Sequence, residues 1–559
     1  MSPSRLDRWL LAAAAALATA ALASGLGRTD LWPPDEPRVA EIAREMAADG
    51  RWLVPTINGH PFLEEPPLFY WLQAAAYRVA GEPSTAAARF PAALAAVAGA
   101  GVTAVLAASL GADPLLAVVV LATAPEYWWM AHSATPDTAA AAAAALALTA
   151  FFAAWRSGRR ALLVLAAGAL GVAFGCKSLL PVGLAVLAVT AFLVTTGWGR
   201  LRPPALALAV VTAAVVPVVW VSFLVVKFGA AAAGSFLFAN HLGRLVGRAE
   251  EGHVRAALYY VFNLVLDFFP WVFVLPAAVA GAWRERDAPE RWFPLLWAAI
   301  MTAALTLAAS KRAHYLLAAY PGFAVLVAQW WPGAWRERAG RAVPRLMLAL
   351  LVLAGPALTL VLASVPAEQI TMIGSRAPAA WADAIRAWSP TRSAILASTL
   401  MALGGLVLVR TDRGGNPSRS MTALAVYLTG MHLLLTLAVL PRLNPLSTAR
   451  IEAERLGVLA DRGVGILVLG SEGSETLSPI LFYARRQLEE INDAATLAIR
   501  LRAGPTCALV RASDHTAPAA GLPGSAVPLG VPPKSRFVIV ESAPGLCTGG
   551  LESARPRGS

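Results

Sequence analysis

Residues 204–227 read PALALAVVTAAVVPVVWVSFLVVK, and Lys227 at the end is the one charged residue of the stretch. A hydrocarbon layer about 30 Å thick takes roughly 20 apolar residues per helix, so this stretch is long enough to cross a membrane. Of all 559 residues, 57% are hydrophobic and 14% are charged, against roughly 25% charged in an average soluble protein. The composition excludes a soluble enzyme, a disordered chain and a small disulfide-stabilised domain.

Apolar runs of this kind recur between residues 9 and 440 and predict an all-α polytopic membrane protein. We expect about thirteen transmembrane helices, several of them short or interrupted by proline. The expected spans are 9–26, 87–110, 115–131, 137–155, 161–176, 180–197, 204–227, 257–282, 293–310, 314–331, 346–365, 392–409 and 421–440.

Arginine sets the expected orientation, because short cytoplasmic loops of membrane proteins collect Lys and Arg. Arginines gather at the N-terminus and in alternate loops after it, apart from a bare turn at 111–114. We therefore expect a multi-pass protein of the bacterial inner membrane, with its N-terminus in the cytoplasm. The loops 27–86, 228–256 and 366–391, and the tail from residue 441, then face the periplasm. The net charge of +12 fits this pattern and anionic lipid better than it fits nucleic acid.

The first apolar run also has the features of a cleaved signal peptide, with an A-x-A site at Ala21–Ala23. We expect it to be retained, because residues of functional character begin soon after it. The membrane part is expected to cover residues 1–440, with 27–86 as its first periplasmic loop.

Residues 441–559 differ in character and predict a small α/β domain on the periplasmic side. The apolar run 464–470 is typical of a strand, 478–486 and 493–501 of helices, and 507–511 and 536–541 of short strands. Cys507 and Cys547 both lie in this tail. An oxidising compartment permits a disulfide between them without requiring it.

The first periplasmic loop holds the densest cluster of candidate functional residues. It begins LWPPDEPRVAEIAREM (31–46), which puts Asp35 and Glu36 at the membrane surface after two prolines that end any preceding helix. The following residues are spaced as in an amphipathic helix that lies at the interface. The acidic pair is either catalytic or the start of a helix that faces water.

Further charged residues stand at other outer helix ends. Asp137 opens the span 137–155, where it is either functional or a stabiliser of the helix N-terminus. Three of the four lysines lie at or near outer loops, against the orientation rule, and so favour an anionic ligand over simple helix capping. Cations at this depth suit a phosphate at the lipid headgroup. The candidates are Lys177, Lys311, Arg312, His314 and Tyr315.

The order of these motifs along the chain resembles that in the GT-C class of polytopic glycosyltransferases. Within this class the chain resembles the branch of protein mannosyltransferases and lipid A aminoarabinose transferases. The resemblance is dense over the first loop and weaker at Thr135-Pro136-Asp137, Lys177, Asn240-His241-Leu242 and Ser310-Lys311-Arg312. The dense part consists of Leu31-Trp32, Asp35-Glu36-Pro37-Arg38, Ala40–Met46, Trp52, Pro55, Asn58-Gly59, Phe62, Pro66-Pro67-Leu68, Tyr70-Trp71-Leu72 and Arg89-Phe90-Pro91.

The resemblance implies transfer of a sugar from a polyprenyl-phosphate donor to lipid A, another glycolipid or a protein, with inversion at the anomeric carbon. It implies catalytic roles for Asp35, Glu36 and Asp137, with Asp35 as general base when the acceptor is a hydroxyl group. The donor phosphate would then contact Arg44, Lys177, Lys311, Arg312, His314 and Tyr315, and the substrate loop would comprise Arg38, Asn58, Glu65 and Tyr70.

Glu65 departs from the family pattern, which usually has Lys before the two prolines. Without that lysine, phosphate binding falls to Lys177, Lys311, Arg312 or Arg44, or the protein uses a different donor or acceptor. Glu64 and His241 match a metal site of some relatives, so a divalent metal such as zinc is an option and no cofactor is required.

Two other functions compete with glycosyltransfer. A transporter or flippase of a lipid-linked sugar would share the polytopic body, but such folds typically show inverted repeats and ionisable residues at mid-membrane. Here the acidic residues cluster at the outer surface. A membrane scaffold or sensor would not need the dense pattern of the first loop. The sequence therefore favours a glycosyltransferase, with transport as the alternative.

Overall fold

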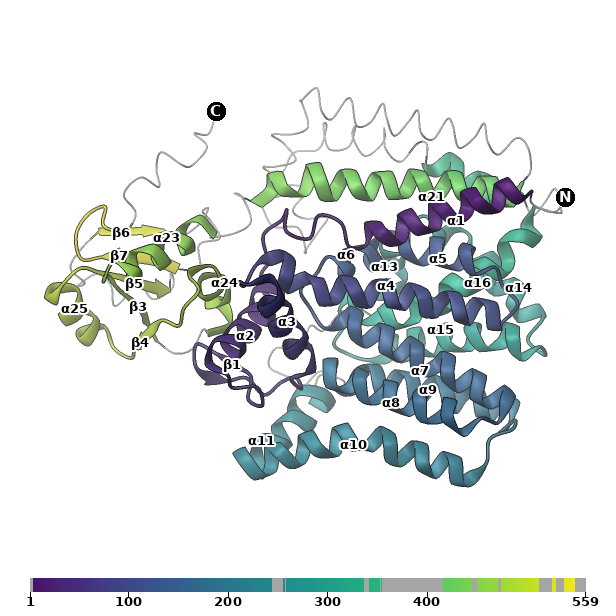
Figure 1. Cartoon of the computed structure of the whole chain (residues 1–559), viewed down its shortest axis with the longest axis horizontal. Coiled ribbons are helices and arrows are strands. Elements are labelled where there is room, and N and C mark those ends of the chain that lie inside the picture. The colour runs from purple at the N-terminus through teal and green to yellow at the C-terminus, as the bar shows by residue number, and fades with distance from the viewer. Residues whose placement is uncertain are drawn as a thin grey trace.

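The computed structural model describes residues 4–243, 255–256, 258–335, 341–351, 353, 416–444, 450–470, 474–511, 525–528 and 537–547. They form a helical bundle and a smaller body built on a β-sheet (Figure 1). Between the two lie the first-loop elements: α2 (Asp35–Asp49), the hairpin β1 (Thr56–Ile57) and β2 (His60–Pro61), and α3 (Leu68–Ala80).

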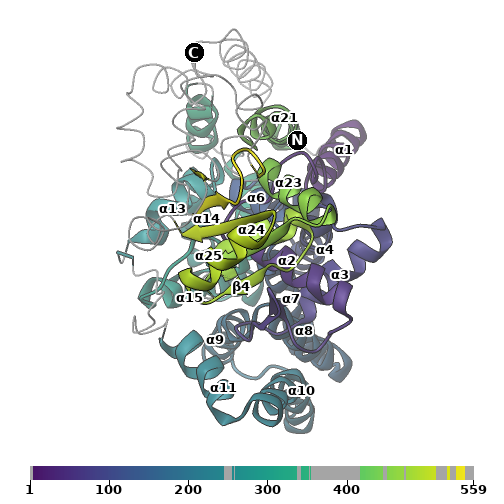
Figure 2. The same cartoon turned by 90° about the vertical axis from the view of Figure 1, so that its left-hand side faces the viewer.

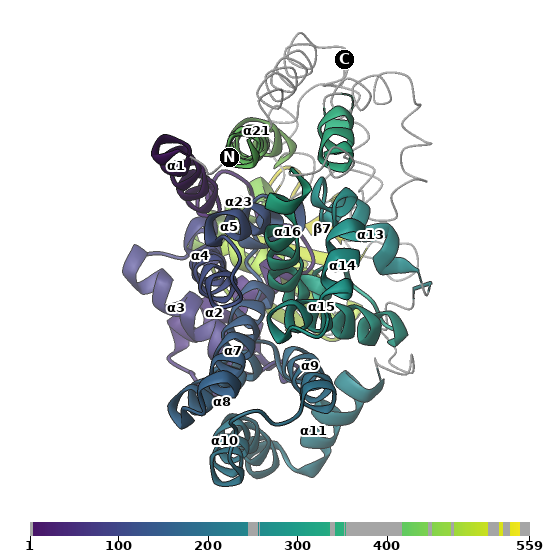
Figure 3. The same cartoon turned by 90° about the vertical axis from the view of Figure 1, so that its right-hand side faces the viewer.

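The bundle consists of long apolar helices that lie side by side, with α1 next to α21 at one edge and α10 at the opposite edge (Figure 3). Its packing is typical of a membrane bundle, because alanine and glycine on facing helices let the backbones approach closely. The bounds are α1 (Arg5–Ala21), α4 (Thr85–Ser109), α5 (Pro114–Ala122), α6 (Pro125–Ala131), α7 (Asp137–Ser157), α8 (Arg160–Lys177), α9 (Leu179–Thr196), α10 (Pro203–Phe228), α11 (Ala230–Gly234), α13 (Tyr259–Asp267), α14 (Leu275–Arg284), α15 (Pro289–Leu307), α16 (Tyr320–Ala334) and α21 (Pro417–Leu434).

Six helices among the described residues are long and apolar enough to cross a membrane, or seven if the pair α5 and α6 counts as one span. The expected span 115–131 is interrupted, because α5 and α6 meet at an angle of 72° before Pro125. The expected span 257–282 is interrupted as well, because α13 and α14 are separated by a 3-10 turn at Trp271–Phe273 that follows Pro270. Proline lacks the N–H that a continuing helix needs. The expected span 392–409 lies outside the described residues.

The C-terminal body is a mixed sheet with helices against it. Its described strands have the order β4-β3-β5-β7-β6; β3 runs parallel to β4 and β5, whereas β7 is antiparallel to β5 and β6. In Figure 2 the sheet and its helices lie in front of the bundle. The bounds are α23 (Arg450–Asp461), β3 (Gly465–Leu469), α24 (Ser474–Ala484), β4 (Glu489–Ile491), α25 (Ala494–Ala503), β5 (Thr506–Arg511), β6 (Ser525–Pro528) and β7 (Phe537–Glu541).

A disulfide joins Cys507 on β5 to Cys547 after β7, a pairing that the sequence left open. The bond closes a loop over a sequence separation of 40 residues. Closing a loop of this length restricts the unfolded chain and is worth about 4 kcal/mol in the chain-entropy description.

We expect the double change Cys507→Ser and Cys547→Ser to make the tail clearly more sensitive to proteolysis, because this restriction is lost. The measurement is limited proteolysis of the detergent-purified protein, with the reduced wild type expected to match the variant. Cys176→Ala, which leaves the bond intact, is the control. Equal resistance of the variant and the wild type would contradict the expectation.

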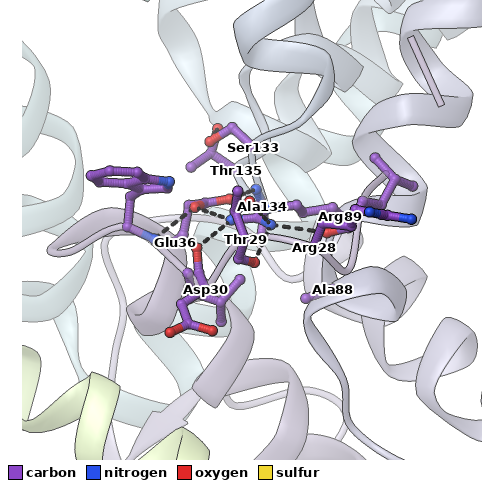
Figure 4. Close-up of polar contacts among 12 residues, drawn as sticks. Arg28, Thr29, Asp30, Glu36, Ala88, Arg89, Ser133, Ala134 and Thr135 are labelled. Atoms are coloured by element: carbon purple, nitrogen blue, oxygen red, sulfur yellow. Dashed lines mark hydrogen bonds and ion pairs between the residues drawn. The ribbon is translucent and has the colours of Figure 1, made fainter. Parts of the chain in front are cut away.

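A buried ion pair joins the first loop to the bundle. Arg89 on α4 is 1% exposed, and its guanidinium donates to both carboxylate oxygens of Glu36 on α2, at 2.9 and 2.8 Å. Arg89 also donates to the backbone carbonyls of Leu26, Thr29 and Asp30. Glu36 accepts from the backbone N–H of Ala134 at 2.6 Å and from that of Trp32 at 2.7 Å. Figure 4 shows the pair enclosed by these backbone segments.

Replacing Arg89 by Met should destabilise the fold by roughly 3–5 kcal/mol, because it leaves the Glu36 carboxylate buried without its counter-ion. The expected readout is a lower thermal midpoint in detergent together with a lower yield in the membrane. Arg28→Met is the matched control, because Arg28 lies in the same region with its side chain exposed. A midpoint as high as that of the control would show that the pair does not hold the loop.

Candidate active site

A cavity of about 970 Å³ opens between the first loop and the bundle. Its lining combines charged side chains with an apolar stripe. Leu180, Leu184 and Leu187 belong to the stripe and follow one face of α9, because residues three and four positions apart share a helix face. The charged part consists of Asp35, Glu36, Arg38, Glu64, Glu65, Asp137, Lys177 and Arg312, with His314 and Tyr315 beside them.

Asp35 is the first residue of α2 and lies between two guanidinium groups. Its Oδ1 accepts from Arg38 at 2.7 Å, and its Oδ2 accepts from Arg312 at 2.8 Å. Arg38 comes from the next turn of the same helix, whereas Arg312 comes from the segment after α15. The Asp35 side chain stays 27% exposed. The chain therefore brings a carboxylate and a cation 277 positions apart in sequence to one point of the cavity wall.

The electrostatic state of Asp35 follows from these neighbours. Burial alone would raise its pKa, but the positive charges of Arg38 and Arg312 outweigh burial and lower the pKa to about 2. Asp35 is thus an anion throughout the neutral range. Arg312 is affected in the reciprocal sense: burial would lower its pKa, but the Asp35 carboxylate raises it above its usual value.

A second charged group lies on the same cavity. Asp137 opens α7 and Lys177 ends α8, and Lys177 Nζ lies 3.2 Å from Asp137 Oδ2 and 3.1 Å from Glu65 Oε1. Glu65 belongs to the irregular segment before α3, and its Oε2 accepts a long hydrogen bond of 3.4 Å from Tyr70. His314 Nε2 lies 3.8 Å from Asp137 Oδ1. One ammonium group thus faces two carboxylates.

The structure places some predicted site residues away from this cavity. Arg44 is buried against Glu41, to which it donates two hydrogen bonds of 2.7 and 2.6 Å, because the two side chains are one helical turn apart. Lys311 turns to the backbone carbonyls of Ala308 and Arg255. Neither lines the cavity, so the predicted phosphate contacts of Arg44 and Lys311 are not supported.

Asn58, predicted in the substrate loop, contacts the C-terminal body instead. Its amide donates to the carbonyl of Leu488 at 3.0 Å and accepts from the N–H of the same residue at 2.7 Å. Tyr70, also predicted there, lies behind Glu65 rather than on the cavity lining. Of the four predicted loop residues, Arg38 and Glu65 line the cavity.

The possible metal pair cannot be assembled from the described side chains. Glu64 lines the cavity, whereas the side chain of His241 lies outside the described set. The described residues contain no group of three or more His, Cys, Asp or Glu side chains that could hold a metal ion. The zinc option therefore stays a prediction.

Two residues that shape the site have no role predictable from sequence pattern alone. Arg89 fixes Glu36, and the signal for it was a single charge within an expected span, which usually marks a partnered group. Tyr483 on α24 accepts from the backbone N–H of Leu31 at 2.8 Å, four positions before Asp35. No spacing rule links a tyrosine of the tail to the first loop.

The chain is similar in sequence and fold to known proteins. Residues 64–223 match the family model described as dolichyl-phosphate-mannose-protein mannosyltransferase. The chain is 28% identical over 308 residues to the undecaprenyl phosphate-alpha-4-amino-4-deoxy-L-arabinose arabinosyl transferase of Edwardsiella ictaluri, covering 53% of this chain and 55% of that protein. The protein of the same name from Pectobacterium atrosepticum is 29% identical over 312 residues, covering 54% and 55%. The chain thus matches about half the length of these curated relatives.

The structural match extends over nearly the whole chain. The crystal structure of ArnT from Cupriavidus metallidurans bound to undecaprenyl phosphate has a TM-score of 0.77 at 21% sequence identity, covering 96% of this chain and 98% of that one. The apo state of the same protein gives a TM-score of 0.76 at 20% identity, covering 97% and 99%. The predicted resemblance to the GT-C glycosyltransferases is confirmed, and the chain has the fold of ArnT.

Proposed function

We propose that this protein is an integral-membrane glycosyltransferase that moves a sugar from a polyprenyl-phosphate donor to an acceptor, either lipid A, another glycolipid or a protein. The observation that carries the proposal is the Asp35 carboxylate held between Arg38 and Arg312 on the wall of a cavity that also has an apolar stripe. The matched relatives are named as transferases that use an undecaprenyl-phosphate sugar.

The lining suits both parts of such a donor. The stripe on α9 offers an apolar surface to a polyprenyl chain, and the volume lies at the upper end of the usual range of roughly 300–1,000 Å³ for ligand sites. Lys177 and Arg312 offer a point charge and a planar fork of donors to the phosphate. A cavity wall with both apolar and cationic surfaces supports binding of a ligand that is apolar at one end and anionic at the other.

The reaction is an in-line displacement at the anomeric carbon. A bond forms from an acceptor oxygen to that carbon as the bond to the phosphate oxygen breaks, and configuration inverts. Polyprenyl phosphate leaves with the bonding electron pair, so negative charge grows where Lys177 and Arg312 stand. These cations stabilise the leaving group because they lie where charge develops in the transition state. Phosphate is a good leaving group and needs no strong acid.

The role of Asp35 depends on the acceptor. An efficient general base at neutral pH has a pKa near 7, whereas that of Asp35 is lowered to about 2. A hydroxyl acceptor would therefore require Arg312 to leave Asp35 for the donor phosphate, which would raise the pKa of the carboxyl group. A phosphate acceptor brings an oxygen that is already ionised, and Asp35 then needs only to stabilise the positive charge on the sugar ring. The pairing of Asp35 with Arg312 favours a phosphate acceptor, such as that of lipid A.

We propose the following topology for this enzyme. The chain crosses the bacterial inner membrane about thirteen times, with spans 115–131 and 257–282 broken as described above. The N-terminus lies in the cytoplasm, and residues 441–559 form a periplasmic α/β domain. The disulfide between Cys507 and Cys547 supports an oxidising location for the tail.

Asp35→Asn should abolish transfer without lowering the amount of protein in the membrane, because the change removes a charge and keeps the shape. The measurement is mass spectrometry of lipid A and of envelope glycans from a deletion strain complemented with each variant. A sugar-sized mass should return with the wild type and not with Asp35→Asn. Asp49→Asn is the matched control, since Asp49 lies at the other end of α2 beside exposed Arg51. Full activity of Asp35→Asn would exclude the proposed role.

The pH dependence tests the pairing of Asp35 with Arg312. In the wild type, Asp35 should contribute no loss of activity between about pH 8 and pH 5, because it is protonated only near its lowered pKa. Arg312→Gln removes one stabilising cation and raises that pKa, so activity should start to fall at a higher pH as the solution is acidified. The measurement is the pH profile of kcat/KM for both proteins, because this ratio reports the groups of the free enzyme, in which Arg312 is paired with Asp35. Profiles of identical shape, whatever their height, would contradict the coupling.

A further inference from the structure

Lys177 supplies an ammonium group to the cavity wall, and two carboxylates contact it. Glu65 Oε1 lies 3.1 Å and Asp137 Oδ2 lies 3.2 Å from its Nζ. All three side chains are largely shielded from water, with exposures of 18% for Lys177, 19% for Glu65 and 7% for Asp137. One positive and two negative charges give this triad a net negative charge. An incoming phosphate would therefore be repelled unless one carboxylate moved away.

The two carboxylates differ in how firmly they are held. Asp137 is the first residue of α7, where the helix N-terminus favours a negative charge, and His314 lies within 3.8 Å of it. Glu65 stands in the irregular segment between β2 and α3, and its second oxygen accepts a hydrogen bond of 3.4 Å from Tyr70, longer than most such bonds. Asp137 is therefore the fixed partner of Lys177, and Glu65 is the partner that can withdraw.

We infer that Glu65 is a stand-in anion that occupies the phosphate position on Lys177 until the donor arrives, and so sets the affinity of the site for phosphate. This inference rests on the proposed function. Before the donor binds, Glu65 neutralises Lys177 and keeps it at the cavity wall. When the donor binds, its phosphate takes the place of the Glu65 carboxylate. After transfer, the return of Glu65 to Lys177 helps the charged polyprenyl phosphate to leave.

The test is the affinity of the detergent-purified full chain for undecaprenyl phosphate, with undecaprenol as the uncharged probe, measured by native mass spectrometry titration. Glu65→Gln keeps the shape and removes the competing charge. It should tighten binding of undecaprenyl phosphate by about three- to tenfold and leave binding of undecaprenol unchanged. Glu82→Gln is the matched control, because Glu82 forms an exposed ion pair with Arg485 and does not line the cavity.

A second background separates a direct effect from a structural one. In the Lys177→Gln variant, adding Glu65→Gln should not tighten binding of undecaprenyl phosphate, because the ammonium group for which Glu65 and the phosphate compete is absent. A simple change in loop structure would persist in that background. Glu65→Ala replaces Glu65→Gln if the latter does not fold, and it carries the same expectation.

The outcomes separate the two proposals. If the wild type prefers undecaprenyl phosphate to undecaprenol and Glu65→Gln binds it no more tightly, Glu65 is not a competing anion and the inference falls while the proposed function stands. A gain that persists without Lys177 also overturns it. If the wild type shows no preference for the phosphate, the proposed function itself fails, and the inference fails with it.

Discussion

The wall of the cavity that carries Asp35 depends on the ion pair between Glu36 and Arg89. It joins the start of α2 to α4, and the carboxylate also receives the backbone N–H of Ala134 from the segment before α7. Burying two charges is costly unless each finds enough partners, and here the guanidinium and the carboxylate find them in both side chain and backbone. Because these partners come from separate elements, the pair fixes their relative positions, and α2 then presents Asp35 to the cavity.

The adjacent residues Asp35 and Glu36 therefore differ in their partners: Glu36 bonds to buried Arg89, and Asp35 bonds to Arg312 on the cavity wall. Glu36 is 4% exposed and has both oxygens bonded to the protein, so no oxygen remains for a substrate without breaking the pair. Asp35 points to the cavity and bonds to two arginines whose groups also line it. The structure shows Glu36 bound to Arg89 within the wall of the cavity, and its catalytic role stays a prediction. Neighbours in a helix point about 100° apart, so Asp35 reaches Arg312 while Glu36 reaches Arg89.

The sequence was informative where chemistry depends on local pattern. Hydropathy predicted the bounds of five helices closely, because a membrane span is recognisable from its own length and composition. These helices are α4, α7, α8, α9 and α10. The sequence also predicted that prolines interrupt some spans, but it did not give the angle at which α5 and α6 meet or the 3-10 turn after Pro270. Within the site, the motif located Asp35 and Asp137, but the direction of a side chain depends on tertiary contacts. Arg44 and Lys311 illustrate this: the structure shows both side chains bonded to other partners, and their predicted phosphate contacts stay predictions.

The cations on the cavity wall already have anionic partners: Asp35 bonds to Arg38 and Arg312, and Asp137 and Glu65 contact Lys177. On the proposed chemistry, binding a phosphate is therefore an exchange of anionic partners rather than the filling of an empty positive site. Such an exchange weakens ground-state binding, because each new contact replaces an existing one. As the bond to the sugar breaks, the phosphate gains charge and competes better than a carboxylate for the same cations. Interactions that are stronger in the transition state than in the ground state accelerate a reaction, and on the proposed chemistry this exchange of partners would supply such a difference.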